Sequence, residues 1–568
     1  MHDLVIRNGE VVDGSGRDRY HADIGISGGR ITEIGRIARG GARAELDAEG
    51  QVVTPGFIDG HTHMDAQLFW DPLGTCSCWH GVTTVVMGNC GFTLAPAPIE
   101  QRSYVLRNLE RSEDIPAEVM AAGIPDWGWT TFREYLDVLD GLPKGINYLS
   151  QIGHSALRTY AMGERAFTEA AGEDDLRAME SELADALAAG ATGLTTSRSP
   201  NHLTPDGKPV ASRMATWAEV QRLVGTLGSA GHGMFQLALE PETRSPDPDL
   251  RREANRRLAA LAVESGVPMT FGLFPGPGWQ DVMATIEGAT AAGGRMFAQT
   301  HSRGASHILT FRSRLHFDVL PEWAPIRALP LEEQRKAFED PETLRRLVAA
   351  TEGEGYNTAG GRPTSPDYDL MHVVTEQLPN PTVADMAAAQ GLHPVELMVK
   401  LALETNFEQL FAQFVKEVRP ASEAEHLELL RHPNTVMTFS DSGAHVSQMM
   451  DSSIHTHLLA YWVRTRAAFT LEEGVRMVSH VPAQAWNVRD RGLLREGYIA
   501  DVNVFDPQRI APDVPLLVAD LPAGGKRLKQ KSTGISATVV AGEVFLRDGE
   551  HTGALPGRLL RSSRGGVC

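Results

Sequence analysis

The sequence predicts an α/β protein with a (β/α)8 barrel in the middle and a small β module assembled from both chain ends. Eight short apolar segments suited to strands recur between helical segments over residues 56–489. Short segments of alternating hydrophobicity flank them, within residues 1–55 and 490–568. Strands that alternate with helices are typical of a parallel sheet covered by helices, and eight such units favour a closed barrel.

The β module comes first in the chain. "DLVIRNGEVVDG" consists of two alternating runs joined at Asn8-Gly9, and "DIGISGGRITEIG" repeats the pattern with Gly28-Gly29, so each predicts a hairpin. Near the other end, "YIADVNVFD" and "SATVVAGEVFLRDG" predict more short strands, with a tight turn near Gly542. Because both ends share this pattern, we expect them to form one module.

The barrel strands follow. Four helical stretches end in glycine, which suits a helix C-cap, and lead almost at once into an apolar strand. The eight expected strands lie in "GFIDGHTH", "GVTTVVMGNCG", "INYLSQIGHS", "ATGLTTS", "MFQLALE", "PMTFGLF", "MFAQTHS" and "NTVMTFSDSGAH". A doubly wound open sheet is the alternative, but no Gly-x-Gly-x-x-Gly follows the first strand to support dinucleotide binding.

Residues 304–434 are too many for a loop between the seventh and eighth strands. Within them, "PLEEQRKAFEDPETLRRLVAAT" and "HPVELMVKLALETN" carry helical patterns. We therefore expect a helical lid inserted near the barrel mouth, where such segments control access to an active site.

Composition narrows the class of protein. With 53 basic against 72 acidic residues the net charge is −19, which disfavours nucleic-acid binding. Four cysteines are too few for a disulfide framework, so we expect a reduced cytoplasmic setting and a structural role for Cys76 and Cys78. No apolar run reaches the ~20 residues of a membrane span, and the first residues already suit a strand, so we expect neither a membrane span nor a signal peptide. A homo-oligomer is left open.

Side chains of metal-ligand type gather where the expected strands end. Catalytic residues of barrel enzymes lie at the carboxyl ends of the strands. The polar residues at those ends are His61, His63, Asn89, Cys90, His154, Thr196, Ser197, Gln236, Glu240, His301 and Asp441, and the sixth strand supplies none. Histidine at three ends, cysteine at one and aspartate at another predict a metal site.

Two His-x-His pairs compete for that role. In a strand, residues two apart project to one side, about 6.6 Å apart along the chain, so His61 and His63 can share an ion. His455 and His457 lie in "SIHTHLLAY", which predicts a helix. There, residues two apart diverge by about 200° around the axis. We therefore expect the first pair to bind metal and the second to be structural.

Several motifs together identify a family resemblance. "TPGFIDGHTHMD", "GVTTVVMGNCGFTLAP", "SDSGAHV" and a closing "REGYIADVNVFD" resemble the amidohydrolase superfamily, and more narrowly the N-acyl-D-amino-acid deacylases (D-aminoacylases). The resemblance covers nearly the whole chain. It implies a distorted (β/α)8 barrel with a small β-sandwich, and metal-dependent hydrolysis of a carbon–nitrogen bond other than a peptide bond.

The resemblance also implies a ligand set. His61 and His63 match the strand-one metal ligands, and Cys90 matches the cysteine ligand of the deacylase branch. Asp441 matches the strand-eight aspartate, which binds metal and shuttles protons. The sequence departs from the family at strands five and six, where "MFQLALEPE" and "PMTFGLFPG" lack the deacylase histidines. This absence predicts one tightly held ion rather than two.

These donors suit a divalent metal, with zinc the first expectation. A catalytic zinc needs about three protein ligands and an open position for water, whose pKa it lowers towards ~7. Near the ion we expect the substrate beside His154, Arg158, His301 and Arg303, with the arginines suited to a carboxylate. For His301, the roles of replacement ligand, oxyanion donor and buried structural residue all stay open.

The leading function is hydrolysis of an N-acyl amino acid or related small amide. One alternative is a mononuclear hydrolase of a cyclic amide, lactone or ester. Another is a metal-free barrel that serves as a binding or scaffold protein. The joint presence of four ligand-type residues at strand ends argues against the last, because a disused site has no physical reason to hold them.

Overall fold

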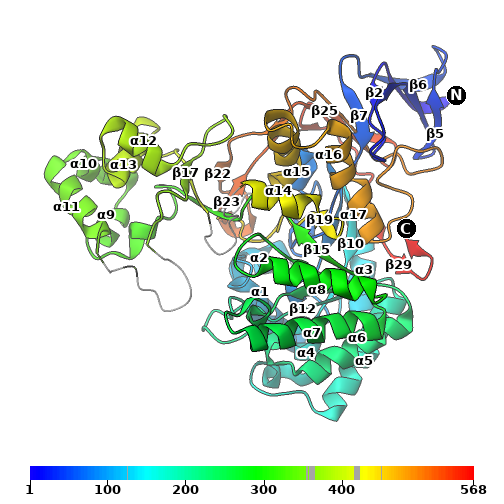
Figure 1. The fold of residues 1–568 in the computed structure, drawn as a ribbon, viewed down its shortest axis with the longest axis horizontal. Coiled ribbons are helices and arrows are strands. Elements are labelled where there is room, and N and C mark those ends of the chain that lie inside the picture. Colours follow the sequence, from blue (N-terminus) through cyan, green and yellow to red (C-terminus); the bar gives the residue numbers. More distant parts are fainter. Residues whose placement is uncertain (125, 354–355, 357–364, 415–422, 449–450) are drawn as a thin grey trace. The chain divides into compact units, whose positions relative to one another are not determined.

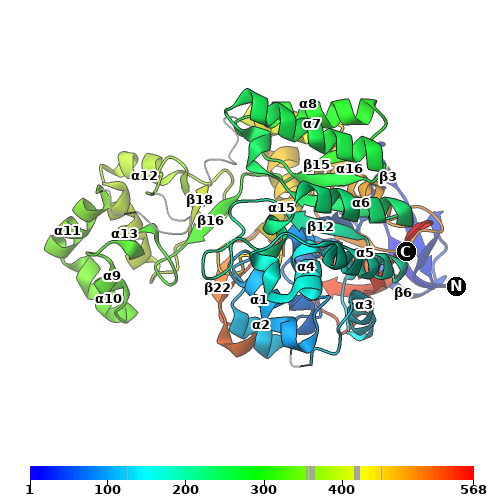
Figure 2. The ribbon, with the colours of Figure 1, turned by 90° about the horizontal axis from the view of Figure 1, so that it is seen from below.

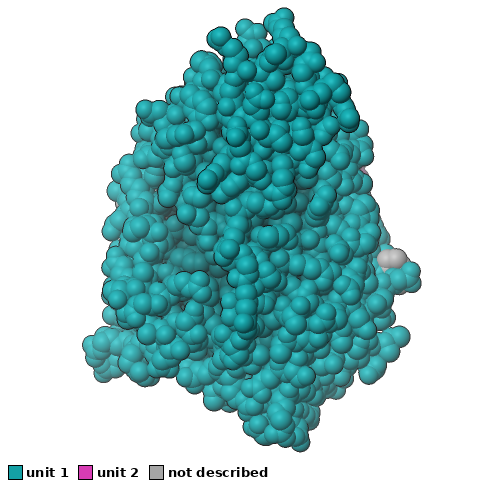
Figure 3. Space-filling model, turned by 90° about the vertical axis from the view of Figure 1, so that its right-hand side faces the viewer, with its two compact units in different colours: residues 1–303, 420–446, 450–568 teal, residues 304–419, 447–449 magenta. Residues whose placement is uncertain are grey.

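The computed structural model describes residues 1–124, 126–353, 356, 365–414, 423–448 and 451–568 (Figure 1). The chain divides into two units. Unit 1, which faces the viewer in Figure 3, comprises Met1–Arg303, Pro420–Val446 and Met450–Cys568, and unit 2 comprises Gly304–Arg419 and Ser447–Met449. Among the described residues, no helix is both long and apolar enough to cross a membrane.

Unit 1 contains both helices and strands (Figures 1 and 2). Its parallel strands follow one another in the order of the chain. They are β8 (Phe57–Asp59), β9 (Val82–Met87), β10 (Asn147–Ser150), β11 (Ile152–Gly153), β12 (Gly193–Ser197), β13 (Met234–Ala238), β14 (Met269–Gly272), β15 (Met296–Thr300) and β19 (Thr435–Met437). They form two sheets, ordered β10-β9-β8, with β28 (Leu559–Leu560) beside β10, and β11-β12-β13-β14-β15-β19. All eight predicted strands are confirmed, with the third divided into β10 and β11.

The carboxyl ends of the first and last of these strands lie side by side. An isolated parallel bridge joins Thr62 to Ser442, a few residues beyond β8 and β19. The backbone N–H of Gly60 also donates to Oγ1 of Thr438. Residues that follow β8 and β19 are therefore neighbours, although Gly60 and Thr438 are 378 positions apart in the sequence.

Among the described residues, helices lie between the parallel strands, and three more follow the strand β19. They are α1 (Arg102–Glu110), α2 (Ala117–Gly123), α3 (Phe132–Gly141), α4 (His154–Met162), α5 (Glu173–Ala188), α6 (Trp217–Ala230), α7 (Pro248–Ser265), α8 (Trp279–Ala291), α14 (Glu423–Arg431), α15 (Ile454–His457), α16 (Leu471–Val478) and α17 (His480–Ala485). Gly231 and Gly266 end α6 and α7 in the left-handed conformation, with φ of 74° and 65°. The predicted glycine caps are confirmed there, because glycine enters this region without strain.

Strands from both chain ends share one sheet. Its order is β27-β26-β25-β20-β7-β2-β3, and β7 (Val52–Pro55) pairs antiparallel with β20 (Val502–Phe505). A second sheet, β5-β4-β1-β6, comes from the N-terminal residues alone. Side chains of both sheets, among them Ile24 and Val539, belong to one buried hydrophobic cluster. The remaining strands here are β1 (His2–Arg7), β2 (Glu10–Val11), β3 (Tyr20–His21), β4 (Asp23–Ser27), β5 (Arg30–Gly35), β6 (Ala42–Asp47), β25 (Ile535–Val540), β26 (Glu543–Arg547) and β27 (Glu550–His551).

Two of the three predicted tight turns are confirmed and one is wrong. β4 and β5 pair across Gly28-Gly29, and β25 and β26 pair across the turn at Gly542. β1 and β2 do not pair with each other: β1 pairs with β4 and β6, and β2 with β3 and β7. Asn8-Gly9 instead carries the chain from one sheet to the other. Gly9 packs so closely that an added Cβ would lie 2.3 Å from Cγ2 of Val53.

The last residues of the chain leave the terminal sheet. β28 (Leu559–Leu560) pairs in parallel with β10, with Leu559 opposite Tyr148. The hydrogen bond from the Tyr148 N–H to the Arg558 carbonyl extends the pairing. The C-terminal segment therefore contributes a strand to the parallel sheet rather than to the β module.

Unit 2 has its own core, which includes Phe311, Trp323 and Leu347. Its elements are α9 (Ala324–Arg327), α10 (Leu331–Glu339), α11 (Pro341–Thr351), α12 (Val383–Gln390), α13 (Pro394–Glu404) and a sheet ordered β16-β18-β17, from β16 (Ser306–Leu309), β17 (Met371–Val373) and β18 (Phe411–Phe414). Both predicted helical stretches of the 304–434 insertion are confirmed. Its residues 354–355, 357–364 and 415–422 lie outside the described residues. The place of this unit at a barrel mouth stays a prediction.

Candidate metal centre

The two histidines that follow β8 lie with Cys90 in one buried cluster. One ligand atom from each of His61, His63 and Cys90 lies within 4.8 Å of the other two. His61 and His63 are almost completely buried. The alternation of the extended chain projects both rings to the same side, as the one-residue spacing predicts.

Hydrogen bonds orient the His61 ring. Its Nδ1 lies 3.1 Å from Oε1 of Gln299, at the end of β15. When Nδ1 carries the proton, Nε2 offers a lone pair toward Cys90, whose Sγ lies 3.5 Å away. A metal-binding histidine is fixed in this way by a partner on its other nitrogen.

A tight turn after β9 presents Cys90. Cys90 has a φ of 54° within the turn Asn89–Gly91, a conformation that non-glycine residues seldom adopt. Its N–H donates to Oε1 of Gln236 over 2.8 Å, and the Gly91 N–H donates to Oγ1 of Thr195 over 3.0 Å. Strand-five and strand-four side chains therefore hold the loop that carries the sulfur.

Asp441 approaches both histidines from the end of β19. Its Oδ1 lies 3.3 Å from Nε2 of His61 and 3.3 Å from Nε2 of His63. The Asp441 N–H donates to the His61 carbonyl, and the turn continues through Gly443, whose φ is 95°. A side chain at position 443 would meet the His63 carbonyl oxygen at 2.6 Å, so the close approach of the two loops requires glycine.

The charges in the cluster stabilise one another. Burial opposes protonation of His61, but the Cys90 sulfur and the Asp441 carboxylate outweigh it and raise the pKa of His61 to about 9. For His63, burial is outweighed by Glu113 and Asp441, and its pKa rises well above the usual range. Burial alone would raise the pKa of Asp441, yet both histidines hold it well below its usual value. Without a metal ion, the cluster thus stabilises positively charged histidines beside an ionised Asp441 carboxylate.

The donor set and its spacing fit a divalent metal ion. Zinc binds histidine nitrogen at about 2.0–2.1 Å and cysteine sulfur at about 2.3 Å, so tetrahedral ligands lie roughly 3.3–3.6 Å apart. The distances of 3.3 Å and 3.5 Å between the donor atoms fall within this range. In the described part of the chain, neither Nε2 of His63 nor Oδ1 of Asp441 has a hydrogen-bond partner. An ion would supply the missing partner for both atoms.

Three further residues near this centre were not predicted. Oε2 of the buried Glu113 lies 3.5 Å from Nε2 of His63. Asp65 is buried beside them, and burial raises the pKa of this carboxyl to about 7. His202 also lies close: burial, with a smaller contribution from His63, lowers its pKa to about 3. Glu113 and His202 lie on connecting segments, whereas the prediction considered only residues at strand ends.

His154 and Arg158 form a separate buried group with Glu219. Nε2 of His154 lies 2.9 Å from the Glu219 carboxylate, and Arg158 donates to both of its oxygens at 2.5 Å. All three side chains are at most 1% exposed. Glu219 neutralises the guanidinium of Arg158. This pairing does not support the predicted role of His154 and Arg158 in substrate binding, which stays a prediction.

His301 and Arg303 follow β15. His301 is buried against Phe274, with ring centroids 4.5 Å apart, and its Nδ1 contacts the Arg303 carbonyl. Arg303 donates to Oδ1 of Asp451 over 3.1 Å. Burial lowers the pKa of His301, and Asp451, with a smaller contribution from Asp441, partly offsets this effect. Among the described residues, the His301 side chain forms no hydrogen bond or ion pair with the residues of the cluster, and its role stays a prediction.

The second His-x-His pair lies on α15, so the predicted helix is confirmed. The His455 ring stacks on Phe57 at a centroid distance of 6.1 Å, and Nδ1 of His457 lies 3.0 Å from Oγ of Ser302. The two rings therefore pack against different neighbours, as their angular separation on a helix requires.

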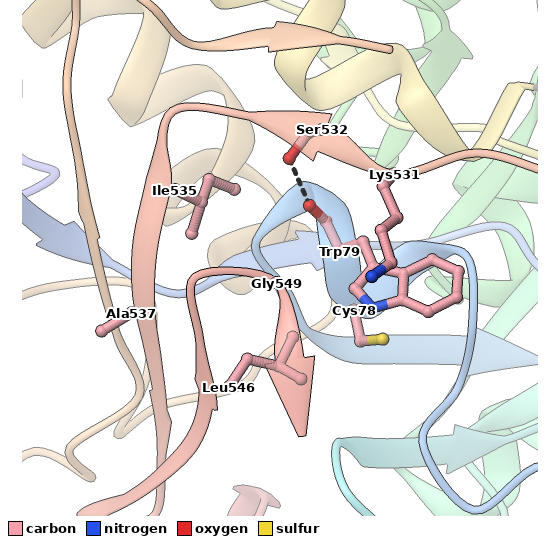
Figure 4. Close-up of a pocket in the computed structure, with 8 residues that line it drawn as sticks. All are labelled: Cys78, Trp79, Lys531, Ser532, Ile535, Ala537, Leu546 and Gly549. Carbon is pink, nitrogen blue, oxygen red and sulfur yellow. Dashed lines mark hydrogen bonds between the residues drawn. The ribbon is translucent and has the colours of Figure 1, made fainter. Parts of the chain in front are cut away.

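Cys76 and Cys78 do not form a disulfide and are buried. Burial raises the pKa of the Cys76 thiol to about 11 and that of Cys78 above its usual range, so both are protonated near neutral pH. Cys78 lines a cavity of only about 10 Å³ together with Trp79 and Ser532, whose hydroxyl donates to the Trp79 carbonyl (Figure 4). These surroundings agree with the predicted structural role.

Comparison with known proteins supplies the family. A profile of the amidohydrolase family matches residues 44–257 and 335–545. The chain is 28% identical to an N-acyl-D-aspartate deacylase of Alcaligenes xylosoxydans xylosoxydans, with 98% of this chain and 95% of that protein covered. It is also 28% identical to an N-acyl-D-glutamate deacylase of the same organism, covering 91% of each.

Solved structures show the same fold. The crystal structure of N-acyl-D-glutamate deacylase from Bordetella bronchiseptica, complexed with zinc and a phosphonate inhibitor, superposes with a TM-score of 0.65 at 23% identity. It covers 99% of both chains. A D-aminoacylase with a binuclear metal centre gives a TM-score of 0.64 at 23% identity, over 99% of this chain and 100% of that one.

Proposed function

Since the chain belongs to the amidohydrolase family, we propose that it is a metal-dependent hydrolase that cleaves the amide bond of an N-acyl amino acid or a related small amide. The observation that carries this proposal is the convergence of His61, His63 and Cys90, with Asp441 in contact with both histidines. The named activities of the relatives, deacylation of N-acyl-D-aspartate and N-acyl-D-glutamate, support an acidic N-acyl-D-amino acid as the first substrate to test.

We propose His61, His63, Cys90 and Asp441 as the residues that hold the ion, with zinc favoured by their nitrogen, sulfur and oxygen donors. When bound, a divalent ion supplies Lewis acidity that polarises the scissile carbonyl and lowers the pKa of water. Gln299 keeps the His61 ring in the orientation that binding requires, because it engages the other ring nitrogen.

Asp441 is the proposed proton carrier. Its side chain is 20% exposed, whereas the His61 side chain is 0% exposed, so Asp441 is more accessible than the histidine that it contacts. A cation beside this carboxylate would keep it ionised, as a proton acceptor requires. In this proposal the carboxylate removes a proton from the attacking water and returns it to the nitrogen of the leaving amine. His301 and Arg303 are proposed to face the substrate.

The finer architecture is also a proposal. We infer that the two parallel sheets belong to one distorted (β/α)8 barrel, supported by the strand order and by the bridge between Thr62 and Ser442. Residues 56–489 would form this barrel. The shared core of the two terminal sheets supports a β-sandwich built from residues of both chain ends, within 1–55 and 490–568.

The test is deacylase activity measured with a matched substrate panel. Purified protein, loaded with zinc, is assayed for amine release from N-acetyl-D-aspartate, N-acetyl-D-glutamate, their L enantiomers and neutral N-acetyl-D-amino acids. The proposal expects hydrolysis that is lost after chelation and restored by the metal. Metal-loaded protein that cleaves lactones or cyclic amides, but no member of the panel, would overturn the N-acyl amino acid assignment.

A further inference from the structure

Glu113 is a buried carboxylate directed at the metal centre. It lies in the segment between α1 and α2, and the Glu113 side chain is 2% exposed. Oε2 lies 3.5 Å from Nε2 of His63, and within the described residues Oε1 has no hydrogen-bond partner. A carboxylate removed from water without hydrogen bonds or a cation is strongly disfavoured, so its position calls for a positive partner.

The protein residues around Glu113 supply no fixed cation. The ion-pair partner of Glu113 is His63, and no arginine or lysine forms an ion pair with Glu113 in the described part of the chain. If His63 were protonated to serve this role, its nitrogen could not bind a metal. A divalent ion between the two resolves the conflict, because it leaves His63 neutral and neutralises the carboxylate.

We propose that Glu113 is a ligand of the ion held by His61 and His63, an inference that rests on the proposed metal-dependent function. The 3.5 Å between its Oε2 and Nε2 of His63 is within the roughly 3.3–3.6 Å expected between two ligands of one zinc ion. Glu113 thereby provides a metal ligand from a loop, whereas strands five and six of this chain provide no histidine ligand.

A further ligand is compatible with the proton carrier. Zinc takes four ligands in most sites and expands to five in some catalytic states. While Asp441 carries the proton, Glu113 would hold the ion together with His61, His63 and Cys90. The loop is tied to the strand-eight turn, because the His445 N–H donates to the Glu113 carbonyl oxygen over 2.5 Å. The two carboxylates are thus held on neighbouring segments.

The experiment compares metal affinity and thermal stability of Glu113→Gln with the wild type. Chelator competition is used to obtain the dissociation constant for Zn²⁺, which we expect to rise at least ~10-fold, the lower limit for losing even an outer-shell partner. Without metal, the melting temperature should stay level or increase, because an unpaired buried charge is removed. The rise in melting temperature on adding Zn²⁺ should shrink. Glu118→Gln on α2, where the side chain is exposed, is the matched control.

A second variant reports contact with the ion directly. Glu113→Cys places a thiol at the ligand position, so the Co²⁺-loaded variant should show stronger thiolate-to-cobalt charge-transfer absorption than the wild type, which has Cys90 alone. Glu118→Cys should not. Wild-type protein that binds no metal overturns the metal-dependent function. Wild type that binds metal while Glu113→Gln binds it equally well, with no added absorption from Glu113→Cys, overturns the role of Glu113 alone.

Discussion

Oδ1 of Asp441 lies 3.3 Å from Nε2 of His61, and the Asp441 N–H donates to the His61 carbonyl. The backbone bond fixes the loop after β19 against the loop after β8, so the side-chain contact follows from strand pairing rather than from chance packing. The same carboxylate oxygen lies 3.3 Å from His63. One oxygen shared by two histidines is the geometry expected around a bound cation.

Asp441→Asn tests the proton carrier. The amide retains the size of the carboxylate but loses its basicity, so kcat should fall by ~10²–10⁴-fold, the usual contribution of a general acid–base group. KM should change far less. Steady-state kinetics on metal-loaded protein, with the metal content checked for each sample, give the answer. If the variant kept more than a tenth of the wild-type kcat, the proton carrier would be another group, and His301 would be the next candidate.

Replacing each histidine pair separates the metal ligands from the structural pair. His61→Ala with His63→Ala should abolish metal retention and activity. His455→Ala with His457→Ala should leave the metal content per folded chain unchanged, although stability falls because both rings are buried. Metal analysis after gel filtration, which removes unfolded material, compares the two. Equal metal loss in both double variants would contradict the assignment of the site to residues 61 and 63.

Glu219→Gln should destabilise the fold. The change leaves Arg158 buried without its anionic partner, and breaking a buried ion pair typically costs ~3–5 kcal/mol. Urea unfolding at pH 7 measures the loss. Glu253→Gln is the control, because Glu253 pairs with Arg256 on the surface, where we expect no measurable change. A Glu219→Gln variant as stable as the control would show that the buried group contributes little.

The same group predicts a loss of stability in acid. Burial would raise the pKa of Glu219, but His154 and Arg158 outweigh it and lower the pKa to about 2. A pKa lowered in the folded state means that the contribution is fully present above the ordinary value near 4.5 and is lost as the pH falls toward 2. The stability difference between wild type and Glu219→Gln should therefore narrow across that window. A constant difference from pH 5 to pH 2.5 would refute this.

Much of the centre was predictable because it depends on local pattern. The alternation in a short strand places His61 and His63 on one side, and parallel strands bring their carboxyl ends together, which predicts the approach of Cys90 and Asp441. Helical periodicity likewise predicted that the side chains of His455 and His457 point in different directions. These inferences require only short-range geometry and one rule about barrels.

Other features depend on contacts that no local pattern encodes. Glu113 lies in a loop between two helices, and the hydrogen bond between its carbonyl and the His445 N–H ties this loop to the turn that follows β19. The alternating runs around Asn8-Gly9 suit a hairpin equally well as a crossing between two sheets, and the tight packing of Gly9 against Val53 favours the crossing. The pairing of Arg158 with Glu219 is equally non-local.

X-ray absorption spectroscopy at the edge of the metal that copurifies with the protein, with the metal content of the same sample, tests the central claim most directly. We predict one tightly held divalent ion per chain, because strands five and six lack histidines. Its ligand shell should contain one sulfur at about 2.3 Å, from Cys90, and nitrogen or oxygen donors at about 2.0–2.2 Å. A chain that holds no metal after zinc loading would contradict the account. A ligand shell that contains no sulfur, and that is unchanged in Cys90→Ala, would contradict it as well.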